Sequence, residues 1–365
     1  MRTSLGLSLL LLLAPTATAD SITKTDGTVL EDVSIVEETL EGVSYTEGRS
    51  KKAELVPAAE VLSVSYSELP EDVDAAMGSM SEGDVLSAVA YLDDYVNAQV
   101  EKSTERRFKW APAFAASKAI ELRMQLFDLN GMLRASERLL KNYGSSRFVP
   151  AAHLHKAMAQ AWSGQADDAR STLEKLERLV ADEGLSSRWT LAAKVAKARL
   201  LPASSPTAQR SELSGLARDA GSFPDVRSLA KLGEAESFML EAEGITNQSK
   251  ARELRDKAEA IFEKIVEDPK ASDEALAGAY TGLGDCLFFR GASTENQDEL
   301  GAAVKSYLRV VVIYGQFGQY VPKALFYSMR CFDLLGDRTR KSRMRSELLA
   351  LYPGTGWAER PEVKR

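Results

Sequence analysis

The sequence predicts a mainly α-helical protein, an α-solenoid of paired antiparallel helices preceded by a small β-module. Three observations predict this fold class. Short alternating runs bounded by turn residues fill residues 20–66. From about residue 73 the apolar residues recur with the 3.6-residue period of a helix. Two of the helical segments also share a start of aromatic-Val-Pro and a Gly that follows the Pro by fourteen residues.

The first nineteen residues, MRTSLGLSLLLLLAPTATA, are typical of an export signal. Arg2 is followed by an apolar run that is too short to span a bilayer comfortably, and Ala17-Thr18-Ala19 has the small-x-small pattern of a cleavage site. We therefore expect cleavage after Ala19 and an exported protein of the periplasm or cell envelope. An uncleaved anchor is the alternative. No later segment has eighteen consecutive apolar residues, so we expect no membrane span after cleavage.

Residues 20–69 are predicted to form a β-module of about five short strands, an SH3-like barrel or half-barrel. Asp26-Gly27 lies between two short runs and indicates a hairpin turn. In VLSVSY (61–66), Leu62, Val64 and Tyr66 alternate with serines, which predicts a strand with one buried face. A sheet of this size has a minor core, so we expect it to pack against the helices that follow.

Residues 70–365 are predicted to form the helical repeat domain, beginning with a helical segment over roughly 73–108. Six helix pairs are expected after it, at 111–127 with 131–143, 150–162 with 165–183, 187–200 with 206–220, 225–243 with 248–268, 273–290 with 299–314, and 322–335 with 338–351. Pro150 and Pro322 suit the first turn of a helix, and Gly164 and Gly336 suit the left-handed position that ends one. Paired helices with short connectors are typical of an α-solenoid.

The helical part resembles the tetratricopeptide-repeat family over roughly residues 110–355. AYTGLGDC places Tyr280, Leu283 and Gly284 in the aromatic-x-x-Leu-Gly spacing of that family's first helix. Ala303 and Tyr307 follow at positions of its second helix. The chain is similar in style to envelope proteins with such repeats, among them the Tol-Pal coordinator and the lipoprotein of the barrel-assembly machine. Lys341 and Met329 depart from the pattern, because the family prefers small residues there.

The resemblance implies a binding or scaffolding protein and no enzyme. First helices line the concave surface in this family. Transferred by position, that implies a partner-binding set of six residues: Trp162, Phe238, Phe288, Phe289, Phe326 and Arg330. Aromatic residues and Arg are common anchors for a protein or peptide partner, although packing between helices is the alternative for each of them. Self-association of the repeat stack end to end is a further alternative.

Several other functions are disfavoured by the residues themselves. The formal net charge of −7 would repel nucleic acid. His153 and His155, the only histidines, lie two positions apart and should face opposite sides of a helix, so they cannot share a metal. We therefore expect no metal and no cofactor. The chain has no G-x-S-x-G and no Gly-rich phosphate loop. An envelope hydrolase that acts on wall or glycan material through acidic residues is kept as an alternative.

The two cysteines, Cys286 and Cys331, occupy equivalent places in consecutive first helices. A disulfide needs Cα atoms within about 7 Å, whereas neighbouring helix axes lie about 8–10 Å apart. Two buried thiols are therefore favoured, and a single bridge remains the alternative.

Overall fold

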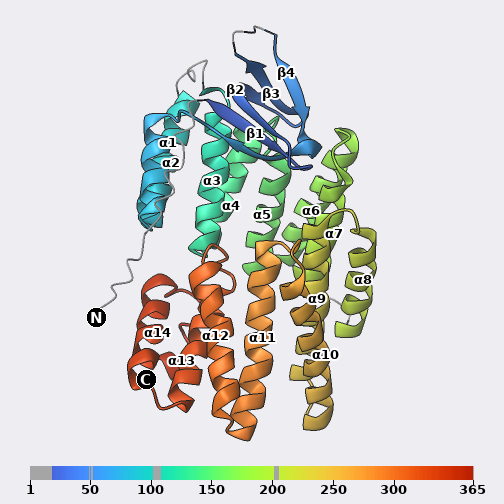
Figure 1. The fold of residues 1–365 in the computed structure, drawn as a ribbon, viewed down its shortest axis with the longest axis vertical. Helices are drawn as coiled ribbons and strands as arrows, with labels where there is room; N and C mark the ends of the chain where they lie inside the picture. Colours follow the sequence, from blue (N-terminus) through green and yellow to red (C-terminus); the bar gives the residue numbers. More distant parts are fainter. Residues whose placement is uncertain (1–18, 49, 51, 102–107, 201–204, 365) are drawn as a thin grey trace, which may run out of the picture.

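The computed structural model describes residues 19–48, 50, 52–101, 108–200 and 205–364. The predicted export signal lies outside these residues, apart from Ala19. Within the described part of the chain, no helix has both the length and the hydropathy needed to cross a membrane. A small sheet lies at one end of a stack of helices (Figure 1). The predicted fold class, a β-module followed by a helical solenoid, is therefore confirmed.

The β-module is a five-stranded antiparallel sheet, which confirms the predicted number of strands. Its strands are β1 (Asp20–Lys24), β2 (Val29–Glu38), β3 (Gly42–Glu47), β4 (Glu54–Pro57) and β5 (Val61–Ser65), in the order β4-β3-β2-β1-β5. A single 3₁₀ turn over Ala58–Glu60 joins β4 to β5. The predicted hairpin turn is also confirmed: Gly27 has a φ of 89°, and its N–H donates to the Lys24 carbonyl at 3.0 Å.

One detail of the predicted β5 strand is wrong. Leu62 should have faced the core, but 64% of it is exposed. The reason is a register shift, because Thr23 pairs with Ser63 while the next residue, Lys24, pairs with Val61. Leu62 is the extra residue of this bulge, and a bulge interrupts the simple alternation of faces on which the prediction relied.

All six predicted helix pairs are present, each within a few residues of its expected bounds. They are α3 (Ala111–Gln125) with α4 (Leu129–Asn142), α5 (Val149–Trp162) with α6 (Ala166–Asp182), α7 (Ser187–Leu200) with α8 (Pro206–Asp219), α9 (Pro224–Glu243) with α10 (Gln248–Glu267), α11 (Asp273–Thr294) with α12 (Gln297–Ile313), and α13 (Val321–Leu334) with α14 (Arg338–Leu351). A last short helix, α15, covers Pro361–Lys364. Gly164 and Gly336 end their helices with φ values of 79° and 77°.

Two helix boundaries differ from the prediction. The segment expected over roughly 73–108 is two helices, α1 (Glu71–Ser81) and α2 (Val85–Glu101), because Gly83 turns the chain with a φ of 82°. Helix α11 continues through Gly291 to Thr294 and ends at Glu295, which has a φ of 53°. Gly291 is buried in this helix, where the absence of a side chain allows Leu300 of α12 to come close.

Close packing within and between the helix pairs explains why small residues recur in the first helices. A Cβ on Gly284 would lie 2.5 Å from the ring of Tyr307, and one on Gly282 would lie 2.2 Å from the ring of Phe262. Tyr307 and Phe262 are almost completely buried. Tyr307 of α12 therefore fills the space left by Gly284 of its partner helix α11, as the tetratricopeptide-like pattern predicts. Phe262 of α10 does the same for Gly282 across two consecutive pairs.

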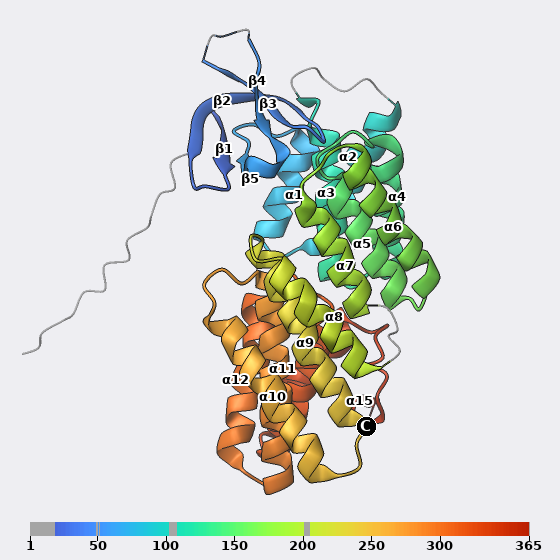
Figure 2. The same cartoon turned by 90° about the vertical axis from the view of Figure 1, so that its right-hand side faces the viewer.

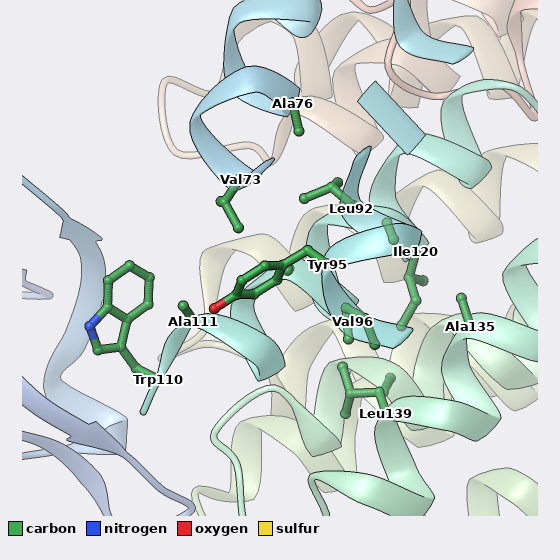
Figure 3. Close-up of a cluster of buried hydrophobic side chains, with 14 of the residues drawn as sticks. Val73, Ala76, Leu92, Tyr95, Val96, Trp110, Ala111, Ile120, Ala135 and Leu139 are labelled. Atoms are coloured by element: carbon green, nitrogen blue, oxygen red, sulfur yellow. The ribbon is translucent and has the colours of Figure 1, made fainter. Parts of the chain in front are cut away.

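The β-module is joined to the helices by a continuous core, as expected for so small a sheet. The rings of Tyr66 and Trp110 stack with centroids 3.5 Å apart. The buried Glu38 of β2 is hydrogen-bonded to Tyr66 and paired with Arg147, which precedes α5. Figure 3 shows Trp110 beside the strands, next to the core that α1 to α4 share.

The repeats do not run on in one direction, because the chain folds back on itself. Figure 1 shows α3 to α7 in a tier next to the sheet and α9 to α14 in a second tier farther from it. Figure 2 shows the same two tiers from the side. The two tiers touch: the Tyr352 hydroxyl donates to the carbonyl of Gln125 at 3.3 Å, across 227 residues. A Cβ on Gly318 would lie 2.3 Å from the Met124 carbonyl oxygen, so only glycine allows this contact. The inner side of the solenoid is therefore partly enclosed.

Candidate partner-binding cleft

Two neighbouring cavities lie on the inner side of the solenoid, between its first helices. The first, of about 300 Å³, lies among α5, α7 and α9, with Glu274 of α11 at its edge. The second, of about 320 Å³, lies among α9, α11 and α13. Glu236, Gln319 and Tyr320 line both cavities. We call the two cavities together the inner cleft.

The first cavity has an apolar wall made by helical residues spaced to face one side. Met158 and Trp162 project from α5, four positions apart and therefore on one face. Alanines and valines of α7 and α9 complete the wall, which includes Ala192, Val195 and Val226. The Trp162 ring also packs against Phe127, with centroids 5.6 Å apart. The second cavity offers an apolar residue at its rim, Leu240, which is 54% exposed.

A half-buried charge network lies where the two cavities meet. Arg199 of α7 is paired with Glu236 of α9 at 3.2 Å and with Glu274 of α11 at 3.5 Å. It also donates a hydrogen bond of 3.0 Å to the hydroxyl of Tyr320, which precedes α13. Burial opposes the charge of Arg199, but the two carboxylates and Tyr320 outweigh it and raise its pKa. Burial also raises the pKa of Glu274, against the influence of Arg199.

Gln319 presents an unused amide to the same place. Its Oε1 and Nε2 are both buried, and neither has a hydrogen-bond partner. Its neighbours fix its backbone, since Gly318 is in close contact with α3 and Tyr320 is bonded to Arg199. An unpaired buried polar atom costs about 1–3 kcal/mol, a cost that a hydrogen-bonding ligand would remove.

The second cavity contains an ion pair of its own. Asp285 of α11 is 4% exposed, and it accepts a hydrogen bond from the Tyr307 hydroxyl at 2.8 Å and pairs with Lys323 of α13. Glu243, at the end of α9, also lines this cavity and is exposed. None of the ion pairs among the described residues includes Glu243.

The six predicted anchors do not form one surface. Trp162 lines the inner cleft, and none of the other five does. Phe326 is 0% exposed and Phe288 6%, so both lie in the core, around Tyr327.

The remaining three anchors are occupied by neighbouring side chains. The guanidinium of Arg210 covers Phe238 at 3.9 Å from its ring centroid, and that of Arg255 covers Phe289 at 4.8 Å. Arg330 is paired with Glu362 at 3.0 Å. The partner-binding role of these residues stays a prediction, and only Trp162 is carried into the proposal below.

Sequence reasoning missed the polar residues of the inner cleft. Three different repeats supply these residues, which are Arg199, Glu236 and Gln319. The spacing of residues along the sequence does not show that they meet. One signal was present. The two copies that begin with aromatic-Val-Pro differ in the aromatic residue, with Phe148 in one and Tyr320 in the other. The hydroxyl that distinguishes them is the atom bonded to Arg199.

The histidines and cysteines lie apart from the cleft. Lys156 and Lys175 are the charged neighbours of His153, whereas Glu121 is that of His155, in keeping with opposite faces of α5. Over the ranges that the structure describes, no group of three or more His, Cys, Asp or Glu is placed to hold a metal ion. Cys286 and Cys331 are free buried thiols, and burial raises the pKa of each.

No family model and no curated protein matches this chain. Among solved structures it is similar to PilW, described as a widely conserved type IV pilus biogenesis factor, at 12% identity and a TM-score of 0.28 over 79% of this chain and 95% of that one. It is also similar to a tetratricopeptide repeat protein from Parabacteroides merdae, at 12% identity and a TM-score of 0.40 over 80% and 95%. A third likeness is to Naa15/Naa10 bound to HypK-THB, at 10% identity and a TM-score of 0.27 over 79% and 54%. At these values the likenesses say nothing of a partner, whereas the helix pairing makes the fold a tetratricopeptide-like solenoid.

Proposed function

We propose that the protein is a non-catalytic scaffold that is exported to a bacterial cell envelope and binds a segment of a protein partner in its inner cleft. The observation that supports this most is the cleft itself. It combines an apolar wall with a few fixed polar groups, and it lies on the side of the solenoid that its first helices line. The proposed export rests on the signal-like residues 1–19.

The dimensions of the cleft suit a short stretch of chain. Two cavities of about 300 and 320 Å³ could each take one or two side chains, while the backbone between them passes Gln319. Trp162 and Leu240 would contact apolar side chains of the partner, one in each cavity. Tryptophan is among the residues that contribute most to such contacts, because it buries a large rigid surface.

The carboxylates of the cleft favour binding over hydrolysis. A hydrolase would need one carboxyl group as acid and another as base. Glu236 and Glu274 are the candidates, but both are paired with the same guanidinium, that of Arg199, so neither carboxylate is free to act on a substrate. Asp285 is likewise engaged by Lys323 and Tyr307.

Site-specific photo-crosslinking would test the proposal. A p-benzoylphenylalanine placed at Leu240 should give one discrete protein adduct in cells that make the protein naturally. The same probe at Leu86, a leucine that is 71% exposed and lines neither cavity, should not give that adduct. Replacing Trp162 with Ala should weaken the adduct. The same adduct from both positions, or none from position 240, would count against the cleft as the binding site.

A further inference from the structure

The polar residues of the inner cleft indicate which kind of ligand it binds. They leave an excess of negative charge and one amide without hydrogen-bond partners. Four carboxylates line the two cavities, Glu236, Glu243, Glu274 and Asp285, and two cations do, Arg199 and Lys323. When all are ionised, the cleft therefore carries two negative charges in excess. The partially enclosed setting strengthens the resulting field, since less water is present to screen it.

The excess negative charge is available to a ligand. Arg199 is shared between Glu236 and Glu274, so one positive charge serves two carboxylates. Glu243 has no ion pair with any described residue and lies at the rim of the second cavity. Glu274 shares the Arg199 cation with Glu236, and burial raises its pKa, so a ligand cation placed beside it would favour its ionised form.

Gln319 adds a requirement for hydrogen bonding. A side-chain amide has one acceptor oxygen and an NH₂ donor on the same side. One residue of an extended segment likewise presents its own N–H and C=O to one side, whereas the N–H and C=O of a single trans peptide group point in opposite directions. The side-chain amide and one such residue therefore match in a pair of antiparallel hydrogen bonds. Because both polar atoms of Gln319 are buried and unpartnered, such a pair would satisfy them together. The contacts of Gly318 and Tyr320 on either side hold the amide in place before any ligand arrives.

We propose that the inner cleft selects an extended peptide segment that carries a lysine or arginine. Gln319 holds the main-chain N–H and C=O of one residue of this segment, and the cation of the segment lies beside Glu236 and Glu243. This rests on the proposed function, because it names the class of polypeptide that the same cleft takes. A neighbouring apolar side chain lies against Met158 and Trp162. An acidic residue at the central position is excluded, because it would meet like charges in a poorly solvated place.

The test uses the full chain and five pools of acetylated, amidated octapeptides, each labelled with a fluorophore. The central residue is Lys, Arg, Ala, Gln or Glu, and the flanking positions are randomised among Ala, Leu, Val and Phe. Fluorescence polarisation should give Kd values for the Lys and Arg pools roughly ten-fold below that of the Glu pool. 1,5-Diaminopentane, a cation without a peptide group, should not displace the Lys pool at equal concentration.

Two variants separate the charge requirement from the amide requirement. Glu243→Lys should narrow the preference of the Lys pool over the Glu pool to about three-fold or less. The matched control Glu263→Lys makes the same charge change at an exposed residue that lines neither cavity, and should leave the preference unchanged. Gln319→Leu should weaken all pools by roughly ten-fold without altering the preference, while its thermal stability stays the same or rises, because it removes an unsatisfied buried amide.

The outcomes distinguish this inference from the proposed function. If peptides bind and depend on Trp162, but the Glu pool binds as tightly as the Lys pool, the cleft binds polypeptide and the charge selection is wrong. If Gln319→Leu binds as the wild type does, the main-chain contact is wrong. Displacement by the diamine would indicate a site for small cations instead. If no pool binds at all, both the inference and the proposed function fail.

Discussion

The hydroxyl of Tyr320 accepts a hydrogen bond of 3.0 Å from Arg199, across 121 residues of the chain. The same guanidinium is paired with Glu236 and Glu274. Four residues from α7, α9, α11 and the turn before α13 are thus joined by one cation. The network also connects the two tiers of helices, because Arg199 lies in α7 of the first tier and its three partners lie in the second tier.

Removing Arg199 should therefore destabilise the whole fold. Arg199→Met leaves two half-buried carboxylates without their cation, and the free energy of unfolding should fall by about 1–3 kcal/mol in urea denaturation. Arg178→Met removes an exposed arginine and should change it by less than about 0.5 kcal/mol. Adding Glu236→Gln and Glu274→Gln to Arg199→Met should recover part of the loss. A loss of stability equal to that of the control would contradict the network's structural role.

The β-module should be part of the same cooperative unit as the first repeats. Tyr66→Ala removes a ring that stacks on Trp110 and bonds to the buried Glu38, and it should lower the free energy of unfolding by about 3 kcal/mol. Tyr91→Ala, at a tyrosine that is 42% exposed, should cost much less. Circular dichroism would follow the helices in both variants. If the helices unfold at the wild-type urea concentration in Tyr66→Ala, the module is energetically independent.

Both cysteines should be unreactive in the native protein. Burial raises the pKa of Cys331 to about 12 and that of Cys286 further, so neither forms a thiolate at pH 8. Ellman's reagent should label neither thiol of the folded chain. After denaturation without reductant it should label two per chain, the full number of cysteines. Labelling of none after denaturation would reveal a disulfide.

Stability should fall between about pH 6.5 and pH 4 because of the histidines. Burial, with Lys156 and Lys175 nearby, lowers the pKa of His153 from 6.5 to about 4. In this window the unfolded chain binds a proton that the native chain rejects, so acidification favours unfolding. His155 acts with the same sign, since burial lowers its pKa against the effect of Glu121.

Urea unfolding at pH 6.5 and pH 4.5 would check this sign. The loss of stability between the two values should be smaller in His153→Asn than in the wild type, and smallest in the variant that also carries His155→Asn. An equal loss in all three proteins would mean that other groups, such as the carboxylates, account for the pH dependence.

The sequence predicted the repeats well because their signals are local. Pro322 begins α13 near its first turn and Gly336 follows its end, and such marks act within a few residues of where they stand. Errors arose where one residue changed the local geometry, as with the bulge at Leu62 and the turn at Gly83.

The cleft was less predictable because it depends on the return of the chain. The close contact of Gly318 with Met124 brings Gln319 to the helices of earlier repeats, and no periodicity of the sequence encodes that contact. The position of Phe326 in the family pattern predicted that it would face a groove. In this chain Phe326 lies in the core, against Tyr327 and Trp357.

The central claim is that the inner cleft is where a polypeptide binds, and methyl NMR would test it most directly. The protein would carry ¹³C-methyl methionine, and the tightest-binding octapeptide pool would be titrated into it. Met158 and Met239 line the two cavities, and their methyl signals should shift in proportion to occupancy. Those of Met132 and Met344, which are buried in α4 and α14, should not move. Shifts of Met132 or Met344 with Met158 and Met239 unchanged would place the binding site elsewhere and contradict the account.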